Sequence, residues 1–268
     1  MTKRECGKKE RSFWDWTGQH FPSLTGAPST RYYLECEKSL FQEFCPQLSG
    51  KKVFKTDLWD EAKNTRILHW ISKQGADVYG LDISTPMVKQ AKALFKGNKN
   101  SHFIVSDLRN IAFDSASFDV IYSMGTIEHF HEYKKSIQEC YRVLRPGGLI
   151  LMGVPNRYDP FLRPILVCVM RVFKLYAYGY ERSFGKHALQ KELMDAGFEP
   201  IGLSGVLFMP GLLRMLDLFF HVHLPWATKL SAYLIRPFAR LYKNHAWLRR
   251  HSYLICVAAR KPQQAEGS

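Results

Sequence analysis

The sequence predicts an α/β protein with a doubly wound, mostly parallel, seven-stranded sheet and helical insertions. From residue 51 onward, short apolar or β-branched runs alternate with helical stretches. Alternation at this spacing is typical of a parallel sheet that is covered by helices on both faces. The chain has 268 residues, of which 46% are hydrophobic, so it can bury one large core.

Seven runs are expected to be strands because they are short, apolar and bounded by turn residues. These runs are residues 52–56, 77–81, 102–105, 118–122, 149–154, 198–208 and 252–259. Helical spacing of apolar residues precedes the first strand and separates most of the others. The expected helices are residues 30–44, 61–73, 85–95, 132–144 and 185–196.

The domain organisation follows from these elements. Residues 1–50 are expected to form an N-terminal arm, loose up to residue 28, followed by one helix. Residues 51–260 are expected to form the main domain, with apolar and basic insertions at 161–178 and 209–250. Residues 261–268 remain as a tail.

Composition limits the classes of partner and compartment. With 38 Lys and Arg against 24 Asp and Glu, the net charge is +14, which suits nucleic acid, anionic lipid or a charged substrate. The six cysteines are scattered without a C-x-x-C pair, which argues against a zinc ribbon and a secreted disulfide scaffold. No signal peptide or transmembrane run is visible. The expected location is therefore the cytoplasm.

Two carboxylates stand at the ends of neighbouring predicted strands, where a doubly wound sheet binds its ligands. Asp82 ends the second strand and can accept hydrogen bonds from both ribose hydroxyls of a nucleoside. Asp107 ends the third strand and can accept a bond from an adenine amino group. Each is about as readily a helix cap or turn residue by itself, but together they favour a nucleoside site.

The next segments carry a more specific pattern. The fourth strand reads S-F-D-V-I from Ser117, and I-E-H from Ile127 and R-V-L-R-P-G-G from Arg142 follow it. This stretch resembles the class I S-adenosylmethionine-dependent methyltransferases, above all the small-molecule and quinone-biosynthesis group (methyltransferase type 11). The resemblance implies a Rossmann-like methyltransferase fold, methyltransferase activity and S-adenosyl-L-methionine as the cofactor.

The resemblance also implies residue roles. Asp82 would hold the ribose, Ile83 and Met87 would pack on the adenine, and Asp107 with the Leu108 backbone would read the adenine edge. Met124 and Gly125 would close over the methionine portion of the cofactor.

The first loop departs from the family, in which an acid precedes G-x-G-x-G. Here residues 53–62 read VFKTDLWDEA, without glycine. Lys55, Thr56, Asp57 and Glu61 are the expected cofactor residues of this loop: Asp57 or Glu61 would meet the cofactor ammonium, and Lys55 its carboxylate. The competing interpretation is a degenerate site that no longer binds the cofactor.

The segment after the fourth strand supplies the catalytic candidates, His129 and Glu128. An oxygen or nitrogen nucleophile can need a base, and His129 is the best placed. The alternative is that this pair only orders the loop. Some quinone-biosynthesis relatives bind a divalent cation with two Glu and a His here, but Gly125 replaces the first Glu, so no metal is expected. Tyr32, Tyr33 and Trp59 are weaker candidates for aromatic contacts to the sulfonium.

The insertions bear on the acceptor. Lys229, Arg236, Arg240 and Lys243 form one helical stripe, and apolar residues lie opposite. This is typical of a helix at an anionic membrane surface, although Pro237 would kink it. The alternative is simple packing onto the sheet with a solvated basic face. The favoured function is O-methylation of a small hydrophobic or lipid-like acceptor. The rivals are a nucleic-acid methyltransferase and a non-catalytic binding protein.

Overall fold

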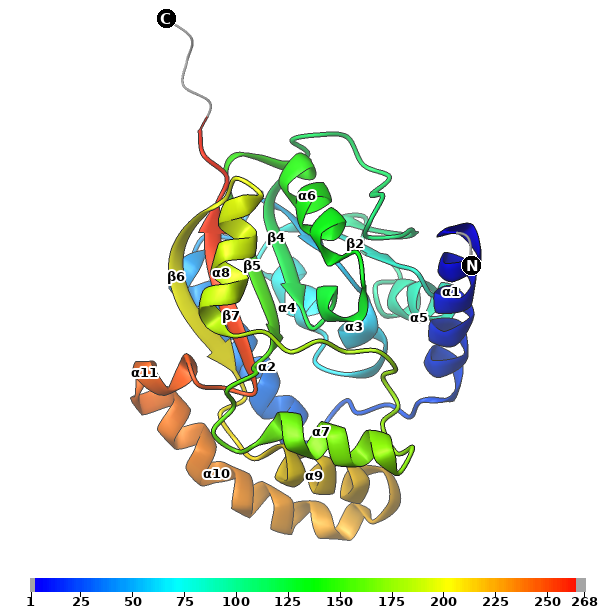
Figure 1. The fold of residues 1–268 in the computed structure, drawn as a ribbon, viewed down its shortest axis with the longest axis vertical. Coiled ribbons are helices and arrows are strands. Elements are labelled where there is room, and N and C mark those ends of the chain that lie inside the picture. The colour runs from blue at the N-terminus through cyan, green and yellow to red at the C-terminus, as the bar shows by residue number, and fades with distance from the viewer. Residues whose placement is uncertain (1–2, 264–268) are drawn as a thin grey trace, which may run out of the picture.

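The computed structural model describes residues 3–263, and it contains one seven-stranded sheet with the strand order β3-β2-β1-β4-β5-β7-β6 (Figure 1). All neighbouring strands pair in parallel except β7, which runs antiparallel to both β5 and β6. The predicted doubly wound, mostly parallel sheet is confirmed. The strands are β1 Lys52–Lys55, β2 Asp77–Asp82, β3 Ser101–Val105, β4 Phe118–Met124, β5 Leu144–Pro155, β6 Glu199–Val206 and β7 Leu254–Arg260.

Helices cover both faces of this sheet and divide its core into two clusters. One cluster joins the sheet to α2 (Pro28–Phe44), α4 (Ile67–Lys73) and α5 (Thr85–Leu94). The other joins it to α6 (Tyr133–Val143) and α8 (Lys186–Asp195). Because both faces are buried, the central strands contain continuous apolar runs such as residues 149–152, without polar alternation.

The helix expected over residues 61–73 is two helices, α3 (Trp59–Lys63) and α4. Arg66 between them has a left-handed backbone, with φ of 61°. The turn is fixed by a side chain, because the Glu61 carboxylate accepts the backbone N–H of Leu68 at 2.9 Å. The apolar spacing that predicted a helix is kept within α4, since Ile67, Leu68 and Ile71 all lie in the core.

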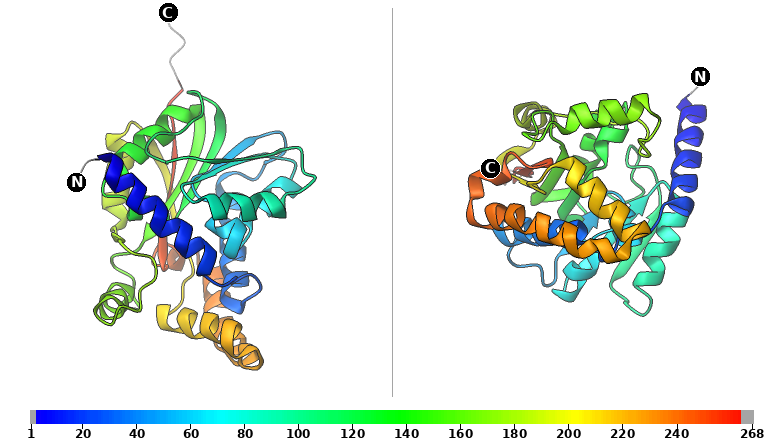
Figure 2. Two further views of the ribbon diagram at one scale, coloured as in Figure 1. Left: turned by 90° about the vertical axis from the view of Figure 1, so that its right-hand side faces the viewer. Right: turned by 90° about the horizontal axis from the view of Figure 1, so that it is seen from below.

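Residues 3–28 are not the expected loose arm. Residues 3–20 form a long helix, α1 (Lys3–His20), which lies along α5 (Figure 2). Asp15 accepts the backbone N–H of Thr85 at 2.8 Å, where the α5 dipole favours a negative charge. Gly18 lets the two helices approach, because a Cβ there would lie 2.6 Å from Met87 Cε. This docking supplies the tertiary packing on which short helices depend. Residues 1 and 2 of the expected arm lie outside the described part.

The two insertions both follow the carboxyl ends of strands. The first gives α7 (Arg163–Val172) after β5. The second follows β6 and gives α9 (Gly211–His223), η2 (Pro225–Ala227), α10 (Thr228–Asn244) and α11 (Ala246–Arg249). Helix α10 continues through Pro237, which faces solvent. The remaining element is η1 (Ile127–His129). Within residues 3–263, no helix combines the length and the apolarity needed to cross a bilayer.

Candidate functional site

The carboxyl ends of β1, β2 and β4 open into one cavity, at the edge of the sheet where doubly wound folds bind ligands. Helix α1 and the segment after α7 complete its wall. The lining residues are Trp14, Thr56, Asp57, Trp59, Leu81, Asp82, Ile83, Met87, Leu108, Gly125, Thr126, His129, Phe130 and Tyr178. Eight of the predicted site residues are therefore brought together: Thr56, Asp57, Asp82, Ile83, Met87, Leu108, Gly125 and His129.

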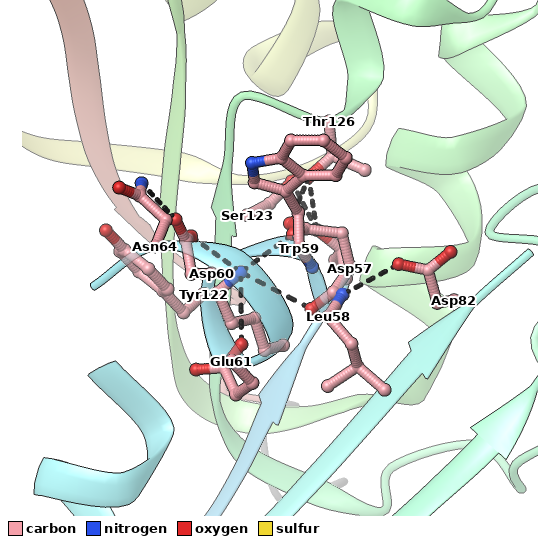
Figure 3. A network of polar contacts seen from close by, with 12 residues as sticks. Asp57, Leu58, Trp59, Asp60, Glu61, Asn64, Asp82, Tyr122, Ser123 and Thr126 are labelled. Atoms are coloured by element: carbon pink, nitrogen blue, oxygen red, sulfur yellow. Dashed lines mark hydrogen bonds and ion pairs between the residues drawn. The ribbon is translucent and has the colours of Figure 1, made fainter. Parts of the chain in front are cut away.

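Asp82 lies at the end of β2 with its carboxylate held by two backbone N–H groups. Leu58 donates to Oδ2 at 3.0 Å and Ser84 donates to Oδ1 at 2.8 Å. Figure 3 shows the first of these bonds reaching across to the loop after β1. Burial raises the pKa of Asp82 to about 7, against the lowering effect of these bonds. A carboxylate so fixed still has lone pairs with which to accept hydroxyl groups of a ligand.

Lys55 does not have the predicted position. Its side chain is fully buried, and its ammonium is enclosed by three carboxylates, at 2.9 Å from Asp57 Oδ1, 2.9 Å from Asp60 Oδ2 and 3.7 Å from Glu61 Oε2. Although burial disfavours the charge, these carboxylates hold the pKa of Lys55 well above its ordinary value. Lys55 and Glu61 lie beneath the cavity rather than in it, so neither side chain fits the cofactor contact expected of it. An ammonium surrounded by acids is neutralised within the protein.

Asp57 is the carboxylate of this group that reaches the cavity. Its Oδ1 accepts the backbone N–H of Trp59 at 3.1 Å and its Oδ2 accepts the Thr126 hydroxyl at 2.7 Å. The Thr56 hydroxyl lies 3.1 Å from that of Thr126 and 2.9 Å from that of Ser123. These bonds tie the end of β1 to the end of β4 (Figure 3). They order the loop that lacks the family's glycines.

Asp107 does not line the cavity, although its neighbour Leu108 does. The Asp107 carboxylate is engaged by the Arg109 guanidinium, with Nη2 2.7 Å from Oδ2, and Arg109 also binds Glu10 of α1 at 2.6 Å. The expected contact of this carboxylate with adenine therefore competes with an ion pair. Leu108, Ile83 and Met87 give the cavity an apolar slot at this end.

His129 ends η1 and borders the cavity with its imidazole. Its Nδ1 lies 2.7 Å from the carbonyl oxygen of Tyr180. Because a carbonyl only accepts, Nδ1 carries the proton and Nε2 keeps its lone pair. Burial lowers the pKa of His129 from its usual value. The neutral ring, with a basic Nε2, is therefore the dominant form at neutral pH.

Two further predicted residues lie behind the cavity. Glu128 is buried with Oε2 unpartnered, and burial raises its pKa well above the usual range. Glu128 does not line the cavity itself, but its Oε1 lies 3.6 Å from a Cβ built on the lining residue Gly125, and its catalytic role stays a prediction. Met124 is buried beneath Gly153, where a Cβ would meet Met124 Sδ at 2.1 Å. Gly125 lines the cavity with its backbone, in a left-handed conformation with φ of 74°.

Three aromatic side chains, those of Trp14, Trp59 and Tyr178, line the cavity, and the sequence predicts only Trp59 among them. Trp14 packs edge-on to His129, with ring centroids 5.1 Å apart, and to Trp59 at 6.4 Å. Tyr178 packs against Trp59 at 5.8 Å. Trp59 was a weak candidate, whereas Trp14 and Tyr178 belong to segments whose positions no local pattern gives. Tyr32 and Tyr33, the other two candidates, lie in the core.

The described residues contain no group of three or more His, Cys, Asp or Glu side chains arranged to hold a metal ion.

Comparison with known proteins agrees with this architecture. Residues 44–152 match the model of the methyltransferase domain family. A probable S-adenosylmethionine-dependent methyltransferase of Mycolicibacterium smegmatis is 25% identical over 199 residues, which span 72% of this chain and 69% of that protein. The ubiquinone biosynthesis O-methyltransferase of Bordetella avium is 26% identical over 175 residues, which span 63% of this chain and 70% of that protein.

Among solved structures, phosphoethanolamine N-methyltransferase 2 of Haemonchus contortus, in complex with S-adenosyl-L-methionine, shares the fold. The TM-score is 0.62 at 20% identity, with 94% of this chain and 60% of that chain covered. The family match, the relatives and the sheet topology agree with one another. Together they support a class I S-adenosylmethionine-dependent methyltransferase, with the methyltransferase domain at residues 44–152.

Proposed function

We propose that this enzyme transfers a methyl group to an oxygen of a small hydrophobic, lipid-like acceptor, with His129 as the base. The observation that carries the proposal is the arrangement of His129. Its neutral imidazole borders the cavity, its tautomer is fixed by Tyr180, and the Trp14 ring packs edge-on against it.

The residues of the cavity fit S-adenosylmethionine. Asp82 offers a buried carboxylate for the ribose hydroxyls, and Ile83, Met87 and Leu108 offer an apolar slot for the adenine. Asp57, at the opposite side of the β1 end, suits the ammonium group. Trp14, Trp59 and Tyr178 offer aromatic rings to a sulfonium. When bound, the cofactor supplies the methyl group on that sulfonium.

The acceptor site that we propose is an adjoining hollow. It is lined by Lys9, Glu10, Phe13, Trp14, His129, His131, Tyr178, Gly179 and Tyr180. It shares Trp14, His129 and Tyr178 with the cofactor cavity, so His129 borders both. Its aromatic side chains favour a flat, apolar molecule over a polar one.

His129 then acts on the acceptor hydroxyl. Nε2 would take the hydroxyl proton as the acceptor oxygen bonds to the methyl carbon; the bond from that carbon to the cofactor sulfur would break, and S-adenosylhomocysteine would leave. The imidazolium would keep its Nδ1–H bond to Tyr180. A neutral imidazole suits this proton transfer at neutral pH. Alignment of the acceptor oxygen by the surrounding rings and exclusion of water supply the rest of the rate.

We further propose that the acceptor is reached at an anionic membrane surface on the cytoplasmic side. Five cysteines of the described part, Cys36, Cys45, Cys140, Cys168 and Cys256, are free thiols, which suits a reducing compartment. The apolar acceptor expected for the hollow is a molecule that partitions into lipid.

The test combines ligand binding with product analysis. Calorimetric titration with S-adenosylhomocysteine should show binding to the wild type, a large loss for Asp82→Ala, and none for Asp77→Ala at the other end of the same strand. Incubation with methyl-labelled S-adenosylmethionine and a total lipid extract should yield an apolar product whose label resists acid and base, as a methyl ether does. Absence of S-adenosylhomocysteine binding to the folded wild type would refute the site. Label that enters only RNA or protein would refute the acceptor class.

A further inference from the structure

The two insertions expose many large apolar side chains, which is unusual for the surface of a soluble protein. Most large apolar side chains that are exposed within residues 3–263 lie on them. On α7 and the residues that flank it, these are Leu162, Ile165, Val169, Val172, Phe173 and Leu175. From α9 to α11 they are Leu212, Leu216, Phe219, Trp226, Leu230, Tyr233, Leu234, Leu241 and Trp247. We call the exposed surface of α7, α9 and α10 the insertion face.

The insertion face lies at the same edge of the sheet as the cofactor cavity. Strands β5 and β6 both run antiparallel to β7, so their carboxyl ends point the same way as those of β1, β2 and β4. Figure 1 shows α7, α9 and α10 together below the sheet, and Figure 2 shows them from below. The chain after α7 leads directly to Tyr178, whose ring lines the cavity.

Helix α10 has three distinct sides. At 100° per residue, Ser231, Ile235 and Tyr242 form the buried side. Leu230, Leu234 and Leu241 form an exposed apolar side about 100° away. The stripe of Lys229, Arg236, Arg240 and Lys243, all exposed, forms the third side about 130° further on. Two neighbouring exposed sides, one apolar and one cationic, match a helix that lies in a lipid headgroup region.

The charges on the rest of the insertion face are also of one sign, positive. Asp217 is the only acid in residues 201–262, and it is fully buried. Its carboxylate accepts the backbone N–H of Ser29 at 2.7 Å and the hydroxyl of Ser231 at 2.5 Å. No acid occurs in residues 160–180, where Arg171 and Lys174 are exposed. The insertion face therefore offers cations and apolar groups to a partner, without a carboxylate.

We infer that the insertion face docks on an anionic lipid bilayer and so brings the acceptor hollow to the membrane. The inference rests on the proposed lipid-like acceptor and names the surface that meets it. Trp226 precedes α10 and Trp247 follows it, which are positions suited to the headgroup level. A second copy of the chain fits less well, because a two-fold contact would bring the two cation stripes together. Nucleic acid would leave the leucines without a partner.

Vesicle flotation tests the inference. The wild type should float with mixed phosphatidylcholine–phosphatidylglycerol vesicles, float much less with pure phosphatidylcholine, and be released by high salt. The double variant Lys229→Glu/Arg240→Glu should partition at least about tenfold more weakly. The double variant Leu230→Ser/Leu234→Ser should also weaken partitioning to the anionic vesicles. Lys96→Glu/Lys99→Glu, exposed near the opposite edge of the sheet, is the matched charge control and should float like the wild type.

The proposed methyltransferase chemistry is measured separately in the same preparations. Both insertion-face variants should bind S-adenosylhomocysteine normally and methylate an acceptor dispersed in neutral detergent, while they lose transfer to a vesicle-borne acceptor. A wild type that stays in the soluble fraction with anionic vesicles at low salt would overturn the docking inference and leave the methyltransferase proposal intact. A dimer that the insertion-face variants dissociate would also overturn it, by assigning the face to a second copy. Loss of S-adenosylhomocysteine binding in the wild type would instead refute the proposed function, whatever the flotation result.

Discussion

The Nδ1 atom of His129 and the carbonyl oxygen of Tyr180 lie 2.7 Å apart. This contact joins the end of η1 to the segment that follows α7, across 51 residues of sequence. It gives the imidazole one tautomer and one orientation, which a general base requires. The contact therefore connects the proposed chemistry to the segment that follows the first insertion.

Replacement of His129 by alanine should lower kcat by about 10² to 10⁴-fold, the usual contribution of a general base. Affinity for S-adenosylhomocysteine should stay close to that of the wild type. Steady-state kinetics and calorimetry measure the two quantities. His187→Ala, an exposed histidine on α8, is the control. Unchanged turnover in His129→Ala would leave His129 without a role in proton transfer.

The pH dependence of kcat and of kcat/KM should report the protonation of two different groups, His129 and Asp82. Burial lowers the pKa of His129, so the acid limb of kcat should lie below pH 6.5, and activity should be lost as pH falls through it. Burial raises the pKa of Asp82 to about 7 in the free protein, so kcat/KM should show an additional limb near pH 7. In Asp82→Asn that limb should disappear. A kcat profile that is flat down to pH 5 would argue against His129 as the base.

Cofactor binding should release protons near neutral pH. The free Asp82 carboxyl, with its pKa of about 7, is partly protonated there. Hydroxyl donors of the ligand stabilise the ionised form and so lower the pKa. Titration with S-adenosylhomocysteine in buffers of different ionisation enthalpy should report this release at pH 7, and Asp82→Asn should abolish it. Proton uptake in the wild type would contradict the contact.

Removal of the buried ammonium should destabilise the fold. Lys55→Met leaves Asp57, Asp60 and Glu61 close together without a counter-charge. Loss of one partner of a buried ionic group costs about 3–5 kcal/mol. Urea unfolding measures this loss, and Lys73→Met, at an exposed site, should change the free energy of unfolding by less than about 0.5 kcal/mol. Equal stability of the two variants would show that the cluster is not coupled as described.

The two tryptophans of α1 offer a matched pair. Trp14 lines the cavity, whereas Trp16 is 62% exposed on the other side of the helix. If the Trp14 ring faces the sulfonium, Trp14→Leu should weaken the binding of S-adenosylmethionine more than the binding of S-adenosylhomocysteine. The two losses of binding free energy should differ by about 0.5–2 kcal/mol. Trp16→Leu should alter neither. Competition titration measures both affinities. An equal loss for the two ligands would assign Trp14 to packing alone.

Sequence reasoning succeeded where local pattern and topology suffice. The seven strands have apolar runs bounded by turns, and Asp82 could be placed because a residue at the end of β2 must lie at the ligand edge of a parallel sheet. His129 follows from the same rule applied to β4.

The same reasoning failed where a side chain's direction depends on distant groups. Nothing local shows that Lys55, at the end of β1, turns away from the cavity toward Asp60 and Glu61 of α3, because the path of the chain between the two elements decides it. Helix α1 was missed because its stability comes from α5, more than sixty residues later. Tyr178 and Trp14 reach the cavity through tertiary packing alone, so no spacing in the sequence connects them.

The buried carboxylate of Asp217 links the proposed docking surface to the sheet that carries the site. It ties the first turn of α2 to both α9 and α10, through Ser29 and Ser231. Helix α2 in turn packs against the central strands, since its Glu37 accepts the Tyr122 hydroxyl at 2.7 Å. The second insertion and the sheet are thus held together as one body by buried hydrogen bonds. On a bilayer, such a body holds the mouth of its hollow at a constant height and tilt, so acceptors would be selected by how deep in the leaflet their reactive oxygen sits.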